Sequence, residues 1–71
     1  MTWNYRIIKH KDIYAVHEVF YTKDKPHTWT ENPINLADES YDGLENAYID
    51  IQEAFAKPVL EIKDGKLVEN K

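Results

Sequence analysis

Apolar and polar residues alternate along the first third of the chain, a spacing that is typical of β-strands with one buried face. The alternation runs through residues 2–9 and resumes through residues 13–22, a stretch rich in β-branched and aromatic residues. A third such stretch covers residues 27–31. Polar residues 10–12 and the proline-containing residues 23–26 separate the stretches, so the pattern predicts a three-stranded antiparallel meander.

After residue 40 the apolar residues recur at spacings of three and four, which predicts one amphipathic helix. Ser40 is a good N-cap because its hydroxyl can accept a hydrogen bond from a free backbone N–H of the first turn. Asp42 suits the helix N-terminus, Gly43 weakens the first turn by about 1 kcal/mol relative to alanine, and Pro58 ends the helix. The predicted buried stripe comprises Tyr41, Leu44, Tyr48, Ile51 and Phe55, with Ala47 and Ala54 beside it. Residues 32–39 form the loop ahead of the helix.

The end of the chain predicts a fourth short strand at residues 59–62. The Asp64-Gly65 pair is typical of a tight hairpin turn, after which residues 67–68 either return as a short strand or fray. We therefore expect one α+β domain over residues 1–71, with a compact core at residues 3–62. Its order is βββαβ: a three-stranded antiparallel meander, one amphipathic helix packed on one face, then a fourth short strand.

The strand register that we predict places the odd-numbered residues of the meander on the core face. Centring the first hairpin on residue 11 pairs Ile7 with Ala15, and centring the second on Asp24 pairs Val19 with Trp29. The core face then holds Trp3, Tyr5, Ile7, Ile13, Ala15, Val19, Tyr21 and Trp29. A slip by one residue would put Asn4 and Arg6 among core residues, which is why we favour this register.

Composition adds limits on stability and location. A chain of 71 residues without cysteine buries a small core that no disulfide reinforces, so self-association is the stabilising feature to look for. No segment has the apolar length of a membrane helix, and the N-terminus has no apolar run of signal-peptide type. These features favour the cytoplasm and indicate no membrane partner.

The formal net charge of −4 is concentrated around the helix, because residues 38–53 contain Asp and Glu but neither Lys nor Arg. Such a surface repels phosphate, which argues against direct nucleic-acid binding. The acidic residues are either a solvated helix face or a surface for a basic partner. Glu45, Asp50 and Glu53 are the candidate partner-binding acids.

Two further groups of residues are candidate sites in the predicted register. Tyr14, Val16 and Phe20 would form an apolar strip on the face opposite the core, either as a dimer or partner interface or as an ordinary exposed sheet face. His17 and Glu31 would be cross-strand neighbours, with Trp29 close by in the sequence. They are either a satisfied polar pair at the core edge or a ligand site.

No motif in the chain indicates catalysis, a cofactor or a metal. His10, His17 and His27 lack the spacing of metal ligands, and two glycines cannot form a phosphate-binding loop. Ser40 is the only serine and suits a helix cap better than a nucleophile. We therefore expect a protein that is not an enzyme.

The order of the elements, with Y-A-V-H-E-V-F-Y in the second strand and E-S-Y-D-G-L-E-N-A opening the helix, resembles the HicB antitoxin family over roughly residues 4–62. The matching helix positions are Ser40, Asp42, Leu44, Glu45 and Ala47. The resemblance implies a truncated ribonuclease-H-like sheet in the order 3-2-1-4, with the last strand parallel to the first. It also implies an acidic antitoxin that self-associates and binds a basic, RNA-cleaving partner of HicA type. The usual glycine-bearing loop is replaced by N-P-I-N-L-A-D, and without a C-terminal DNA-binding segment we expect no operator binding.

The leading hypothesis is a non-enzymatic, HicB-like interaction domain that binds a basic protein and can form a homodimer. The alternative is a small stand-alone domain of the same architecture that binds a small ligand or metal near His17, Glu31 and Trp29. A third hypothesis is a mobile-element protein that blocks a host factor by charge mimicry, and the sequence does not separate it from the first.

Overall fold

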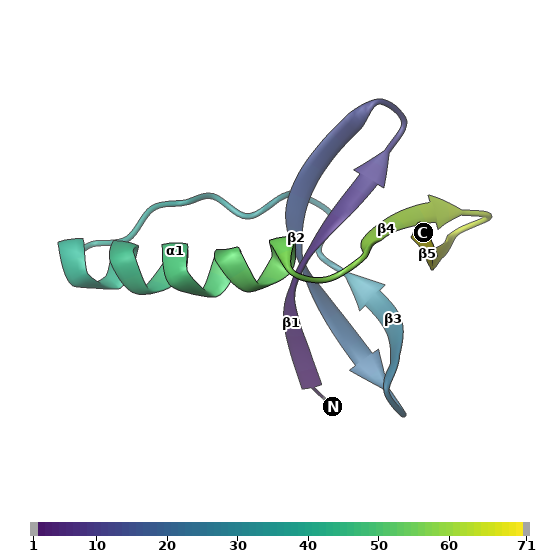
Figure 1. Ribbon diagram of the computed structural model, residues 1–71, viewed down its shortest axis with the longest axis horizontal. Coiled ribbons are helices and arrows are strands. Elements are labelled where there is room, and N and C mark those ends of the chain that lie inside the picture. The colour runs from purple at the N-terminus through teal and green to yellow at the C-terminus, as the bar shows by residue number, and fades with distance from the viewer. Residues whose placement is uncertain (1, 71) are drawn as a thin grey trace.

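Five strands form one mixed sheet that curls into a nearly closed barrel, and one helix extends from it (Figure 1). The computed structural model describes residues 2–70. The elements in chain order are β1 (Thr2–His10), β2 (Ile13–Thr22), β3 (Lys25–Trp29), α1 (Tyr41–Phe55), β4 (Val59–Lys63) and β5 (Lys66–Asn70). The sheet order is β3-β2-β1-β4-β5, in which β4 runs parallel to β1 and the other neighbours are antiparallel. The fold is therefore α+β with the order βββαββ.

The α+β class and the predicted elements are confirmed, and a fifth strand is added to them. The residues after the Asp64-Gly65 turn return as β5, where Leu67 pairs with Ile62. Both turn residues have positive φ, as a tight hairpin of this kind requires. The strand order 3-2-1-4 with the fourth strand parallel to the first, which the HicB resemblance implies, is also present. The third strand begins two residues earlier than predicted, directly after the Lys23-Asp24 turn.

The core lies inside the barrel and receives side chains from all five strands. Ile8, Val19 and Leu60 are almost fully buried at its centre. Tyr21, Trp29, Ile62 and Leu67 pack against them. Because Leu67 belongs to β5, the core extends beyond the predicted limit of residue 62.

The predicted register of the first hairpin is wrong by one residue. Ala15 pairs with Ile8, and His17 pairs with Arg6. The reason is the turn: Lys11 and Asp12 form a two-residue loop closed by the His10–Ile13 pair, with Lys11 at a positive φ of 59°. The even-numbered residues of β1 therefore share the core face with the odd-numbered residues of β2, and Trp3, Tyr5 and Ile7 lie on the other face. The predicted pairing of Val19 with Trp29 is confirmed.

Arg6 lies in the core, whereas the predicted register placed it on the other face of the sheet. Arg6 is 5% exposed, and its guanidinium donates to the Tyr21 hydroxyl at 2.7 Å and to the Pro58 carbonyl at 2.8 Å. Removing a guanidinium cation from water is very costly, and these two hydrogen bonds compensate part of that cost. Arg6 thereby connects β1 to β2 and to the residue that precedes β4. Its Nε and the Oδ1 of Asn4 are buried without a hydrogen-bond partner.

Arg6→Ala should lower the free energy of unfolding by about 2–4 kcal/mol, because it leaves the Tyr21 hydroxyl and the Pro58 carbonyl without their donor. Tyr21→Phe removes one of the two bonds to the buried cation and should cost about 1.5–3 kcal/mol, because hydrogen bonds to charged groups are stronger than average. Urea denaturation followed by tryptophan fluorescence measures both. Lys63→Ala, an exposed cation on β4, is the control and should change the stability by less than about 0.5 kcal/mol. An Arg6→Ala protein as stable as the wild type would contradict an internal position for Arg6.

Candidate functional site

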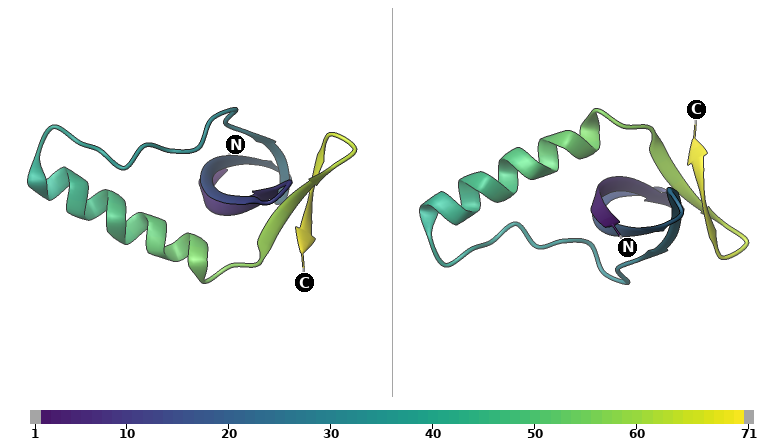
Figure 2. Two further views of the ribbon diagram at one scale, coloured as in Figure 1. Left: turned by 90° about the horizontal axis from the view of Figure 1, so that it is seen from above. Right: turned by 90° about the horizontal axis from the view of Figure 1, so that it is seen from below.

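The chain between β3 and β4 forms an arm that extends away from the barrel (Figure 2). We use "arm" for residues 30–56, which comprise the loop after β3, helix α1 and its C-cap residue. The loop runs out alongside the helix, and the helix returns so that its C-terminal end lies against the barrel. Only this end is buried: Ile51 and Ala54 are 9% and 0% exposed. The N-terminal half of α1 therefore lies beyond the sheet that was expected to cover it.

The predicted buried stripe of the helix is wrong at three of its five positions. Tyr41, Tyr48 and Phe55 are 79%, 52% and 70% exposed. They are seven residues apart, so they form one line along the helix, beside the line that packs inward. The inward line instead uses Leu44 and Ala47, which are half-buried, followed by the two buried residues Ile51 and Ala54. The arm thus presents a row of aromatic side chains to solvent.

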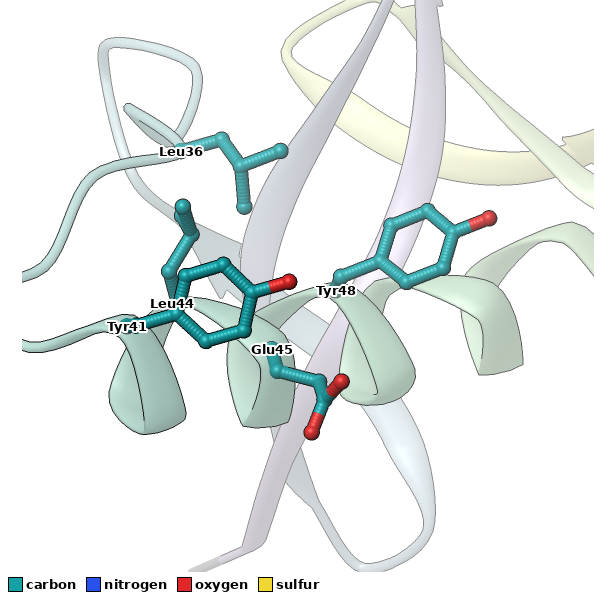
Figure 3. Close-up of a pocket in the computed structure, with 5 residues that line it drawn as sticks. All are labelled: Leu36, Tyr41, Leu44, Glu45 and Tyr48. Carbon is teal, nitrogen blue, oxygen red and sulfur yellow. The ribbon is translucent and has the colours of Figure 1, made fainter.

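A groove lies between the loop and the first two turns of the helix (Figure 3). It has a volume of about 340 Å³ and is lined by Leu36 from the loop and by Tyr41, Leu44, Glu45 and Tyr48 from α1. In Figure 3 the Leu44 side chain points toward Leu36 and the Tyr41 ring lies next to Leu44, whereas the Tyr48 ring and the Glu45 carboxylate point away from the two leucines. The site is therefore apolar where Leu36 meets the helix, and Glu45 and Tyr48 line it further out.

The loop–helix junction is held by a short chain of hydrogen bonds. The Ser40 backbone N–H and hydroxyl donate to Asp38 Oδ1 at 3.0 and 3.3 Å, and Ser40 Oγ accepts from the Gly43 N–H at 3.0 Å. The predicted Ser40 cap is confirmed. A Cβ at Gly43 would overlap the Asp38 carboxylate, so a larger residue at this position would displace the exposed Asp38 side chain from Ser40.

The arm carries most of the negative charge of the protein. Seven of the 13 acidic residues lie in residues 30–56, which contain neither Lys nor Arg. All nine Lys and Arg lie outside the arm, together with six acidic residues. The formal charge of the arm is therefore −7 and that of the remainder +3, so the two parts of the molecule are electrostatically complementary.

The inner end of the arm lies against β1 on the side of Tyr5. Asp50 and Glu53 line a small cavity of about 140 Å³ with Trp3, Asn4 and Tyr5. Burial, followed by the negative charges of Glu18 and Asp50, raises the pKa of Tyr5 above its ordinary value. Asp50 and Glu53 thus lie on a different side of the helix from Glu45, so the three predicted acids do not form one contiguous surface.

The predicted apolar strip on β2 is only partly exposed. Tyr14 is 61% exposed, whereas Val16 and Phe20 are half-buried. The loop of the arm runs past this strand, since the Ile34 N–H donates to the Val16 carbonyl at 2.9 Å. The three residues therefore do not make the continuous exposed surface that the sequence suggested, and of the three only Tyr14 is exposed.

His17 and Glu31 line one cavity but do not form a pair. His17 is 8% exposed, and its Nδ1 donates to the Thr30 carbonyl at 2.9 Å, whereas Glu31 is exposed. β3 ends at Trp29, so Glu31 lies beyond the ladder that was expected to place it opposite His17. The cavity has a volume of about 230 Å³ and its lining includes His17 and Glu31 but not Trp29, which packs against the barrel core.

Within residues 2–70, no group of three or more His, Asp or Glu side chains is arranged to hold a metal ion. In the same part of the chain, no helix is long and apolar enough to cross a membrane. Searches against protein-family models, curated proteins and solved structures found no match to this chain.

The groove was missed because the helix pattern was interpreted as one buried stripe. The separate seven-residue spacing of Tyr41, Tyr48 and Phe55 is visible in the sequence, and it distinguishes this line from that of Ile51 and Ala54. Leu36 had no sequence signal, since a single leucine in a loop indicates nothing about its neighbours.

Gly43→Ala tests the capping arrangement. Alanine should stabilise a helix interior by about 1 kcal/mol relative to glycine, but here it displaces the Asp38 carboxylate from Ser40. We expect Gly43→Ala to leave the stability unchanged or lower in the wild type, and to raise it by up to about 1 kcal/mol in an Asp38→Ala background. Thermal denaturation of the four proteins gives this double-mutant cycle. Equal effects in both backgrounds would show that Asp38 does not occupy the space above Gly43.

Asp50→Asn tests the position of the helix on β1. It removes a negative charge beside Tyr5 and should lower the pKa of Tyr5 toward its ordinary value, whereas Asp24→Asn should not. Ultraviolet-absorbance titration, with Tyr5→Phe to identify the signal, measures this shift. Because folding raises this pKa, Tyr5 contributes full stability below the unfolded value and loses it as the pH rises through the folded value. The Tyr5→Phe protein should accordingly lose less stability above about pH 10 than the wild type does.

Proposed function

We propose that the protein is a non-catalytic protein–protein interaction domain whose arm binds a basic protein partner. The observation that carries this proposal is the groove of the arm, a largely apolar surface lined by the Glu45 carboxylate within a segment that contains neither Lys nor Arg. Large apolar side chains that gather on the surface are a feature of interaction sites. Tyrosine combines large contact area with a hydrogen-bonding group, and it is enriched in protein interfaces.

The charge of the arm favours one kind of partner. Seven carboxylates within residues 30–56 attract a basic surface and accelerate its association, and they repel nucleic acid. The groove supplies the apolar contact, so an anchor residue of the partner would insert between Leu36 and the tyrosines while lysine or arginine side chains meet Glu45. The partner chemistry is thus an apolar or aromatic anchor flanked by cations.

The resemblance to the HicB family is part of this proposal. The order β3-β2-β1-β4 with parallel β1 and β4 is what such a domain would have, and a basic partner is what an acidic antitoxin would bind. Within a HicB-like or truncated ribonuclease-H-like domain, the arm would be the partner-binding element. The proposed location is the cytoplasm.

The ligand-binding alternative has less support. His17 and Glu31 line a cavity of about 230 Å³, below the range of about 300–1,000 Å³ that is usual for ligand sites, and Trp29 lies elsewhere. No observation favours a metal or a small ligand over a protein partner.

Affinity capture tests the proposal directly. Tagged protein incubated with cell lysate should recover a basic protein at low salt and less of it at high salt, as identified by mass spectrometry. The triple variant Glu45→Gln, Asp50→Asn, Glu53→Gln should reduce recovery at least about tenfold, because it removes three of the seven arm charges.

The matched control is Asp24→Asn, Asp64→Asn, Glu69→Gln, which changes the net charge equally but lies outside the arm. Asparagine tolerates the positive φ of Asp24 and Asp64, so this control should fold. It should recover the partner like the wild type. Equal recovery by the two triple variants, or a partner that persists unchanged at high salt, would disprove binding through the acidic arm.

A further inference from the structure

The tip of the hairpin formed by β1 and β2 carries lysine side chains, which the arm lacks. We use "tip" for residues 9–14. Ile13 and Tyr14 are 69% and 61% exposed there, beside the cations Lys9 and Lys11. Lys9 Nζ lies 5.7 Å from the centre of the Tyr14 ring, which keeps a cation next to an exposed aromatic side chain. The tip thus combines two exposed apolar side chains with two lysines and one aspartate, Asp12.

The tip and the arm groove are complementary in charge, and both expose apolar side chains. The groove is largely apolar with Glu45 among its lining residues and Asp42 in the first turn of the helix, whereas the tip exposes Ile13 and Tyr14 and has a formal charge of +1 from Lys9, Lys11 and Asp12. Ile13 or Tyr14 is the kind of side chain that would fill a space between Leu36, Leu44 and the two tyrosines. The tip cannot reach the groove of its own chain in this structure, because the hairpin and the arm leave the barrel in different directions (Figure 1).

We infer that the groove is occupied, in the free protein, by the hairpin tip of a second copy of this chain. If each copy inserts its tip into the arm of the other around a two-fold axis, both surfaces of both copies are used and the assembly closes as a dimer. A reciprocal contact also doubles the buried area, which matters because a stable interface buries about 800 Å² on each partner. Each of the two contacts in the dimer then joins an arm of formal charge −7 to a tip of formal charge +1.

This inference rests on the proposed function, since it concerns the same groove and adds its regulation. The dimer conceals the groove, so a basic partner would bind by displacing the tip of the second copy and would convert the dimer into a complex with one chain. The tip then acts as an internal competitor that sets how strongly a partner must bind.

Variants that reverse a charge on the tip, on the arm, or on both test the inference. Light scattering with size-exclusion chromatography should give the wild-type protein twice the mass of one chain. Lys11→Glu and Glu45→Lys should each weaken dimerisation at least about tenfold, because each places like charges together in both contacts of the dimer. An equimolar mixture of the two variants should restore the dimer, since each contact again joins opposite charges, and the Lys11→Glu, Glu45→Lys double variant should do the same.

Lys66→Glu and Glu69→Lys are the matched controls, being exposed residues of β5 with the same charge changes, and both should remain dimers. A monomeric wild type, single variants that dimerise normally, or a mixture that stays monomeric would overturn the inference. The proposed function is tested separately by capture of a basic partner. A monomer that captures its partner through the arm would refute only the dimer, and a tip-dependent dimer without a basic partner would refute only the proposed function.

Discussion

The buried guanidinium of Arg6 is the interaction on which the rest of the structure depends. It lies inside the barrel and joins β1 to the hydroxyl of Tyr21 on β2 and to the carbonyl of Pro58 just before β4. A barrel built from few apolar residues gains a polar crosslink from this arrangement. The cost is that the cation and its partners must keep their geometry, because each unpaired group would be desolvated without compensation. The bond to the Pro58 carbonyl holds the segment between the end of α1 and the start of β4 close to β1.

The position of the C-terminal end of the helix explains why the arm extends away from the barrel. Helix α1 contacts β1 at Ile51 and Ala54 only near its C-terminus, so its N-terminal half extends beyond the sheet and carries Tyr41 and Tyr48 with it. The Asp38–Ser40–Gly43 cap then turns the loop so that Leu36 faces the helix and forms the groove. A small chain thereby separates a negative arm from a remainder of net positive charge.

The local structure was largely predictable from particular residues. The alternation in β1 and β2, the Asp64-Gly65 turn and the Ser40 cap each determine their geometry through backbone and side-chain preferences that act within a few residues. The register was not predictable in the same way. Choosing between Ile7 and Ile8 opposite Ala15 required the knowledge that a buried arginine could find two oxygen atoms, one of them 52 residues away in the sequence.

The sequence by itself therefore determined the order of the first four strands and the helix, the Ser40 cap, the Asp64-Gly65 turn, and the concentration of negative charge in residues 30–56. Only the tertiary structure decided which face of β1 is internal, which helix line is buried, and that Leu36 meets Tyr41 and Tyr48 in one groove. The physical reason is the range of the forces involved. Propensity, capping and charge act over neighbouring residues, whereas burial depends on where the curled sheet ends beneath the helix, and that is set by contacts between distant parts of the chain.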